Sequence, residues 1–100
     1  MARYIISPIG RMVDNYWDYD KDLILKTLFD WHRDMFNKED IPLRPMRLAE
    51  HIGGFDIERL KDICKKLSEE GLVEEIKVGH NVFYRISPRG IELVERLVKV

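Results

Sequence analysis

Apolar residues recur every three or four positions over residues 23–36, which is the spacing of a helix with one buried face. They stand at positions 24, 28, 31 and 35 and again at 25, 29 and 36, so the apolar face is wide. Asp20 or Asp22 precedes this segment, and either is a good N-cap because its carboxylate accepts hydrogen bonds from the free N–H groups of a first turn. The pattern predicts a helix that starts at one of these residues and ends before the polar run 37–40.

Two shorter helices are predicted next, with a glycine pair between them. Pro45 suits the first turn of a helix over residues 46–52. The glycines at 53–54 end it, because glycine adopts positive φ without strain. Asp56 can cap a third helix that ends at Gly71. The apolar positions of this third helix are Leu60, Ile63, Cys64 and Leu67.

The hydrophobic period changes from helical to alternating after Gly71. Residues 72–78 and 81–86 are rich in β-branched and aromatic residues and flank a short turn, which predicts a β-hairpin. Ser87 can cap a final helix, and Pro88 suits its first position. The apolar residues of that helix are Ile91, Leu93, Val94, Leu97 and Val98. They are too many for one narrow stripe, so part of this helix is expected to lie in an interface.

The first 19 residues are rich in aromatic side chains and contain one clear turn, at residues 7–10. We therefore divide the chain into an aromatic N-terminal segment, 1–19, and a domain at 20–100. A domain of this size has little reason to expose large apolar side chains on both segments. We expect a two-fold homodimer in which the N-terminal segment is an arm packed across the axis. The expected interface residues are Tyr16, Trp17, Leu93 and Leu97.

Composition limits the class of protein. The 100 residues are 45% hydrophobic and 35% charged, the balance of one soluble domain with a modest core. No apolar run approaches the ~18 residues that cross a bilayer, and Tyr4–Ile6 is too short for a signal peptide. Cys64 is the single cysteine, so no disulfide forms within the chain. We expect a cytoplasmic protein, and the lack of Gln beside abundant Glu, Lys and Arg favours a thermophile.

Catalytic and metal-binding chemistry finds no support in the residue pattern. The three histidines and Cys64 are scattered and lack the paired spacing of zinc ligands. The aspartates of residues 14–22 lack the glycine and the distal glutamate of a calcium loop. Neither a phosphate loop nor a nucleophile elbow is present. We predict no enzyme activity, no metal and no cofactor.

The order of predicted elements resembles the winged helix-turn-helix superfamily over about residues 22–99. LAEHIG at 48–53 resembles the helix and turn that enter the motif, and residues 60–73 resemble the end of a recognition helix. FYRISPRGI at 83–91 is similar to the second wing strand and following helix of MarR-like and PadR-like regulators, including archaeal types. The resemblance implies an α+β, mainly α fold: a three-helix unit, a β-hairpin wing and an additional C-terminal helix. It also implies binding to double-stranded DNA.

Charge is unevenly distributed, although the net charge is only −1. Residues 41–66 carry six basic and four acidic side chains, whereas acids outnumber bases in the segments on either side. Arg44 and Arg47, at the start of the second helix, are expected to meet backbone phosphates. Residues 76–91 contain no acid, which suits wing contacts with phosphates or the minor groove. The expected wing contacts are Lys77, His80, Asn81, Arg85 and Arg89.

The third helix presents a mixed face when Leu60 is taken as the inward direction. The candidate DNA-contacting residues on it are Glu58, Arg59, Lys61, Asp62, Lys65 and Lys66. A carboxylate can accept a hydrogen bond from cytosine N4, but non-specific affinity depends on Lys and Arg. The same residues could instead form ordinary ion pairs on a solvated helix, worth ~0.2–0.5 kcal/mol each.

Two functions remain open from the sequence. The first is a sequence-specific DNA-binding transcription regulator that acts as a dimer. The second is a winged-helix module that binds protein in a transcription, replication or assembly complex, which the net charge and the acids of the third helix favour. In either case Leu48, Ile52, Leu60, Leu67, Leu72 and Phe83 are expected to be buried together.

Overall fold

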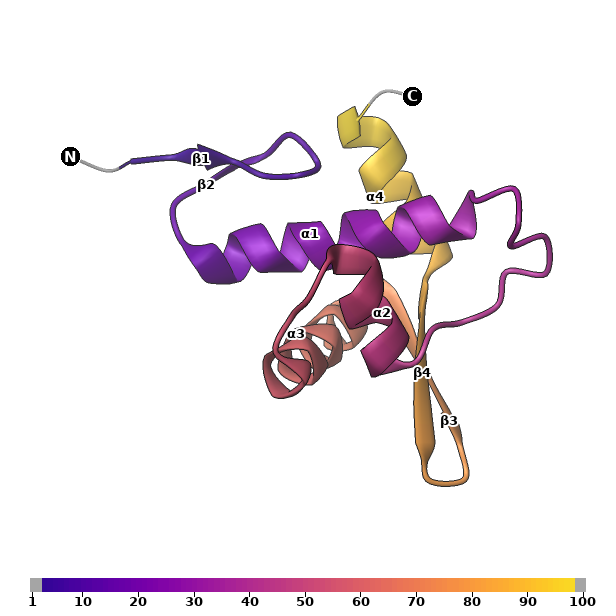
Figure 1. Ribbon diagram of the computed structural model, residues 1–100. Helices are drawn as coiled ribbons and strands as arrows, with labels where there is room; N and C mark the ends of the chain where they lie inside the picture. The colour runs from indigo at the N-terminus through magenta and orange to yellow at the C-terminus, as the bar shows by residue number, and fades with distance from the viewer. Residues whose placement is uncertain (1–2, 99–100) are drawn as a thin grey trace.

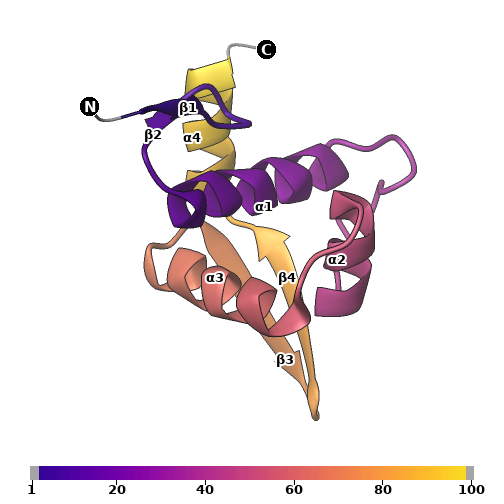
Figure 2. The same ribbon diagram turned by 60° about the vertical axis from the view of Figure 1, so that its left-hand side comes forward.

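The computed structural model describes residues 3–98, which form an α+β, mainly helical fold (Figure 1). The elements are β1 (Ile5–Ile6), β2 (Met12–Val13), α1 (Tyr16–His32), α2 (Pro45–Ile52), α3 (Ile57–Glu69), β3 (Val73–Val78), β4 (Asn81–Ile86) and α4 (Pro88–Val98). Figures 1 and 2 show α1 between two groups of elements. The β1–β2 hairpin and the end of α4 lie on one side of it, and α2, α3 and the β3–β4 hairpin on the other. This arrangement confirms the predicted fold class, the winged helix with an additional C-terminal helix.

Helix α1 differs from its prediction at both ends. It begins at Tyr16 rather than near residue 20, because the side chain of Asn15 accepts a hydrogen bond from the Asp18 N–H at 2.8 Å. It ends at His32, four residues before Phe36. Beyond it the side chain of the buried Asn37 donates to the Trp31 carbonyl at 3.0 Å and stabilises the following loop. The division predicted at residue 20 therefore falls inside this helix.

The aspartates predicted to cap α1 form ion pairs instead. Asp20 pairs with Arg59 of α3 at 2.9 Å. Asp22 is fully buried and pairs with Arg11, which follows the β1–β2 turn. Both carboxylates hold other segments against α1, which the local sequence pattern could not indicate.

The turn between α2 and α3 has the predicted geometry. Gly53 ends α2 with φ of 99°, a left-handed conformation that glycine adopts without strain. Asp56 caps α3, since its side chain accepts a hydrogen bond from the Glu58 N–H at 3.0 Å. The two helices therefore have fixed ends on either side of a tight turn, and α3 packs against α1 through its buried face. The buried residues of α3 are Leu60, Ile63, Cys64 and Leu67.

The face of β4 that packs against the core is the opposite of the predicted one. Tyr84 and Ile86 of β4 are buried, whereas Phe83 is only partly buried. Side chains alternate along a strand, so the two outcomes are opposite faces of the same strand. Leu43 forms an isolated bridge to Tyr84 and joins the wing to the segment before α2. Of the predicted core, Leu48, Leu60 and Leu67 are confirmed as buried, and Ile52 and Leu72 are partly buried against it. Phe83 is partly buried but is not packed against the core, so its prediction as a core residue is wrong.

The base of the wing is held closely against α4. Ser87 accepts a hydrogen bond from the Gly90 N–H at 3.0 Å, as a cap does, and its hydroxyl donates to the Gly71 carbonyl at 2.6 Å. A Cβ atom at residue 90 would lie 2.2 Å from the carbonyl oxygen of Leu72. The glycine is therefore required for α4 to approach the start of β3.

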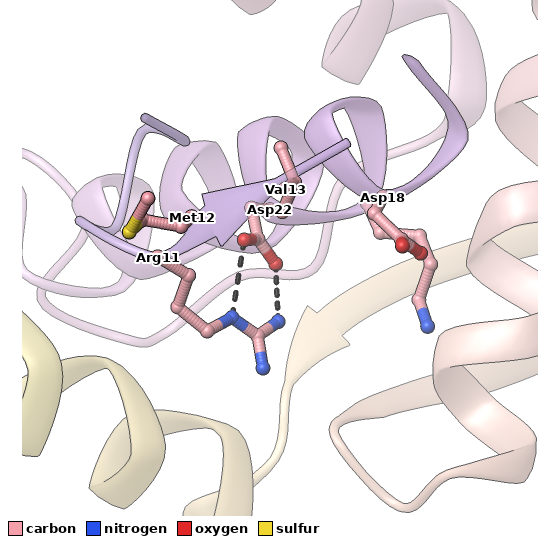
Figure 3. A pocket seen from close by; sticks show the side chains of 6 residues that line it. Arg11, Met12, Val13, Asp18 and Asp22 are labelled. Atoms are coloured by element: carbon pink, nitrogen blue, oxygen red, sulfur yellow. Dashed lines mark hydrogen bonds and ion pairs between the residues drawn. The ribbon is translucent and has the colours of Figure 1, made fainter. Parts of the chain in front are cut away.

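The β1–β2 hairpin is a feature that the sequence pattern did not predict. Its strands pair Ile5 with Val13 and Ile6 with Met12. Arg11 makes a two-point contact with Asp22 at a hollow of about 250 Å³, as Figure 3 shows. Met12, which lines the same hollow, is exposed on the outer face of the hairpin. The hairpin is thus anchored by one ion pair and by the buried residues Ile9 and Val13.

Candidate nucleic-acid interface

A hollow of about 370 Å³ lies between the start of α2 and the start of α3. Its lining residues are Arg44, Pro45, Met46, Arg47, Ile57 and Lys61. Three are cationic and three are apolar. In both ribbon views the wing extends past the helices on the same side of the molecule as the start of α2 (Figures 1 and 2). The start of α2, the start of α3 and the wing (the β3–β4 hairpin) therefore form one face, which we call the lower face.

The N-terminus of α2 opens onto this face. Arg44 occupies the cap position with an extended backbone, and in the described structure no side chain caps the helix. Pro45 has no N–H to satisfy, and the free N–H groups that follow it carry the positive end of the helix dipole. The Arg44 guanidinium lies 5.5 Å from the centre of the Phe83 ring, a cation–π contact that positions it beside the wing. This combination suits an anion such as a backbone phosphate.

The two flanks of α3 are different. Arg59 lies on the flank toward α1, where it binds Asp20 and stands 5.4 Å from the centre of the Trp17 ring. Glu70, just beyond the helix, binds Lys21 of α1 at 2.7 Å. Lys66 lies between them on the same flank, since positions four and seven apart share one side of a helix. We call this side the frame flank.

The opposite side of α3, here the open flank, lines the hollow with Ile57 and Lys61. Within the described residues, Lys61 is paired only with Glu58, at 3.9 Å, and both side chains are exposed. Lys65 follows one turn later and forms no ion pair with any of residues 3–98. Glu58 and Asp62 are also exposed, so the acids of α3 remain near this surface.

Four of the cations predicted to bind DNA fall into two groups by how closely they are paired with an acid of the protein. Arg85 is locked: it donates to Glu74 at 2.7 Å, and that hydrogen bond raises the pKa of its guanidinium. Arg59 is held by two hydrogen bonds to Asp20, at 2.9 and 3.2 Å. Arg47 is loosely held, 3.4 Å from Glu50, and Lys77 lies 4.0 Å from Glu75. Loose pairs between exposed side chains are worth little, so these cations can exchange their partner for a phosphate.

The wing tip carries the remaining predicted contacts. Lys77, His80 and Asn81 are exposed at or beside the tip. Residues 76–91 are free of acids in sequence, but strand pairing places Glu74 opposite Arg85. Arg89 lies apart from the lower face, in a hollow of about 450 Å³ lined by residues of α4 and of the turn that follows α3. The wing is therefore less positive than its sequence indicates.

Several residues of the lower face were not predicted. Met46, Pro45 and Ile57 were assigned no binding role, and Phe83 was expected in the core. The one available signal was Met46, an apolar residue at the exposed start of a helix. Ile57 and Pro45 are separated by a whole helix in sequence, so their proximity depends on the turn at Gly53.

Other chemistry is not apparent in the described part of the chain. Residues 3–98 bring no three His, Cys, Asp or Glu side chains together as a metal site would require. Burial raises the pKa of the Cys64 thiol to about 12, as expected for a core residue. No helix among these residues has the length and apolar character to cross a membrane.

Comparisons with known proteins agree with the fold. No family model and no curated protein matches the chain. The crystal structure of AF1382 from Archaeoglobus fulgidus is similar, with a TM-score of 0.60 and 16% identity over 79% of this chain and 84% of that one. A "putative DNA-binding protein" from Ralstonia eutropha is similar with a TM-score of 0.58 and 14% identity, over 75% of this chain and 93% of that one. At these identities the likeness concerns the fold alone.

Proposed function

We propose that the protein binds double-stranded DNA in a sequence-specific manner through its lower face, as a transcription regulator of the MarR-like or PadR-like type. The observation that carries the proposal is the hollow at the start of α2, where Arg44, Arg47 and Lys61 surround a helix N-terminus without a side-chain cap. Helix α3 supplies base contacts beside it, and Lys77, His80 and Asn81 of the wing reach the adjacent backbone. The DNA-binding description of the Ralstonia eutropha protein with this fold supports the same function.

The binding experiment uses short genomic duplexes at several salt concentrations. Each phosphate contact contributes a slope of about −0.9 to the dependence of log affinity on log salt. Arg47→Ala and Lys77→Ala are each expected to reduce that slope by about 1 and to weaken all sequences alike. Arg96→Ala is the matched control, because Arg96 of α4 is about as exposed as Arg47 (70% against 66%) and is also loosely paired, 4.0 Å from Glu92. Unchanged slopes for Arg47→Ala and Lys77→Ala would contradict the proposal.

We further propose that the protein is a homodimer joined through the side opposite the wing. Tyr16 at the start of α1 is 74% exposed, and Tyr4, Ile6 and Met12 are exposed on the β1–β2 hairpin beside it. Trp17 of α1 and Leu97 of α4 are each 37% exposed, whereas Leu93 is partly buried against the core of its own chain. An apolar surface of this kind is typical of a protein interface. With the interface at this end, two wings remain free to reach successive half-sites.

The dimer is tested by sedimentation at tens of micromolar. The parent is expected to sediment as a dimer, and Met12→Ser combined with Tyr16→Ser as a monomer. Met35→Ser with Phe36→Ser is a control, since these two side chains, in the loop after α1, are more exposed (73% and 86%) than Met12 and Tyr16 (65% and 74%), respectively. A monomeric parent would refute the proposal.

One observation favours the alternative function, a module that binds protein. Glu58, Asp62 and Glu69 are all exposed on α3, and a duplex would repel any that approach a phosphate. In that case no duplex binds even at low salt, and a protein partner co-purifies through the same face.

A further inference from the structure

The lower-face hollow combines charge with an apolar lining that phosphate contacts do not need. Met46 is 64% exposed there, at the second position of α2, although neither the core nor the helix cap uses it. Pro45 has no N–H, and the side chains of Met46 and Ile57 offer no strong hydrogen-bond donor. Phosphate contacts are made by cationic, hydroxyl and amide groups and by backbone N–H groups, and none of these three side chains supplies such a group. Ile57 is partly buried against the core, so Met46 is the exposed member of the set.

The occupant of the hollow must therefore bring an apolar group flanked by negative charge. Among the base edges of the major groove, the C5-methyl of thymine is the apolar group, and phosphates run along both sides of it. Arg44, Arg47 and Lys61 stand around Pro45, Met46 and Ile57 in the corresponding arrangement. The charge and the lining of the hollow thus complement the thymine edge together with its backbone.

The position of the hollow in the fold also fits this occupant. Ile57 begins α3, whose N-terminal part is the portion of such a helix that contacts base edges. Met46 belongs to α2 but lines the same hollow, so apolar side chains from two helices meet there. A methionine suits the task, since its flexible thioether adapts to irregular apolar surfaces.

We propose that Met46, Ile57 and Pro45 form a reading site for thymine methyl groups in the major groove. This inference rests on the proposed DNA-binding function and gives it a specificity: bound sequences contain thymine opposite the start of α3. The cations of the hollow hold the backbone, and the apolar side chains distinguish thymine from cytosine and from uracil.

The experiment uses a pool of 30-base-pair duplexes selected from a random library by binding to the parent protein. The pool is amplified once with dTTP and once with dUTP, because uracil differs from thymine only in lacking the methyl group. Burial of one methyl is worth about a fourfold change in affinity. We expect the parent to bind the thymine pool about three- to tenfold more tightly than the uracil pool. Met46→Ala should bring this ratio close to one while leaving the salt slope unchanged.

Met35→Ala is the matched control, since Met35 is an exposed methionine outside the hollow, and it should retain the full ratio. Equal binding of both pools by the parent, or a full ratio in Met46→Ala, would overturn the inference while leaving the DNA-binding proposal intact. Failure to bind either pool at low salt would overturn both. If a synthetic peptide of alternating glutamate and leucine then bound with dependence on Met46, the hollow would be a site for an acidic protein segment.

Discussion

The two flanks of α3 carry similar residues but have different surroundings. On the frame flank, Arg59 is bound to Asp20 and lies against Trp17, so its charge is already used within the protein. On the open flank, Lys61 has only a loose contact with Glu58, and it borders a hollow that faces outward. A cation is therefore available to a ligand only where the neighbouring element leaves it unpaired. Net charge and helical projection alone do not reveal this difference.

Replacement of the residue that divides the flanks should have the largest effect on stability. Leu60 is fully buried, and it defines which side of α3 points inward. We expect Leu60→Ala to lower the free energy of unfolding by about 2–5 kcal/mol, because it removes buried apolar atoms and leaves a cavity. Thermal or urea unfolding measures this. A variant as stable as the parent would mean that the register of α3, and hence both flanks, is assigned wrongly.

Loss of a frame-flank cation should have the next largest effect. Arg59→Ala removes two hydrogen bonds to Asp20 and the contact with Trp17. Because the pair is only partly buried, we expect a loss of about 1–2 kcal/mol in unfolding free energy. Lys61→Ala, on the open flank, should change stability by less than about 0.5 kcal/mol. Comparable losses for both variants would remove the distinction between the flanks.

Much of this fold could be predicted from sequence, and the failures have a common cause. The caps at Asp56 and Ser87 and the turn at Gly53 depend on neighbouring residues, and all three were predicted. The start of α1 was not, because Asp20 and Asp22 resemble caps but are held by distant arginines.

The candidate site shows the same limit. Arg47 was expected to meet a backbone phosphate; its side chain is exposed, and its contact with DNA stays a prediction. Locking of Arg85 by Glu74 and the grouping of Met46 with Ile57 depend on tertiary contacts. The choice between Phe83 and Tyr84 for the core also depends on strand register, since three successive apolar residues conceal the alternation.

Substitution of an acid on the exposed side of α3 should have a smaller effect, on DNA affinity rather than on stability. Glu58 is 84% exposed, with its carboxylate 3.9 Å from Lys61. We expect Glu58→Gln to tighten binding to every duplex by a few-fold, because it removes a charge that repels phosphate and competes for Lys61. Competition between duplexes of different sequence distinguishes this from base reading. Relaxed discrimination at a single position would show instead that Glu58 accepts a hydrogen bond from cytosine.

The central claim is that the open flank of α3, and not its frame flank, faces DNA. Its most direct test compares Lys61→Ala with Lys66→Ala, two lysines on one helix that differ in the flank they occupy. The slope of log affinity against log salt is measured for each on the same duplex. We predict that Lys61→Ala makes the slope less negative by about 0.9, the contribution of one phosphate contact, and that Lys66→Ala leaves the slope unchanged. Equal reductions in both variants, or a reduction in Lys66→Ala alone, would contradict the account.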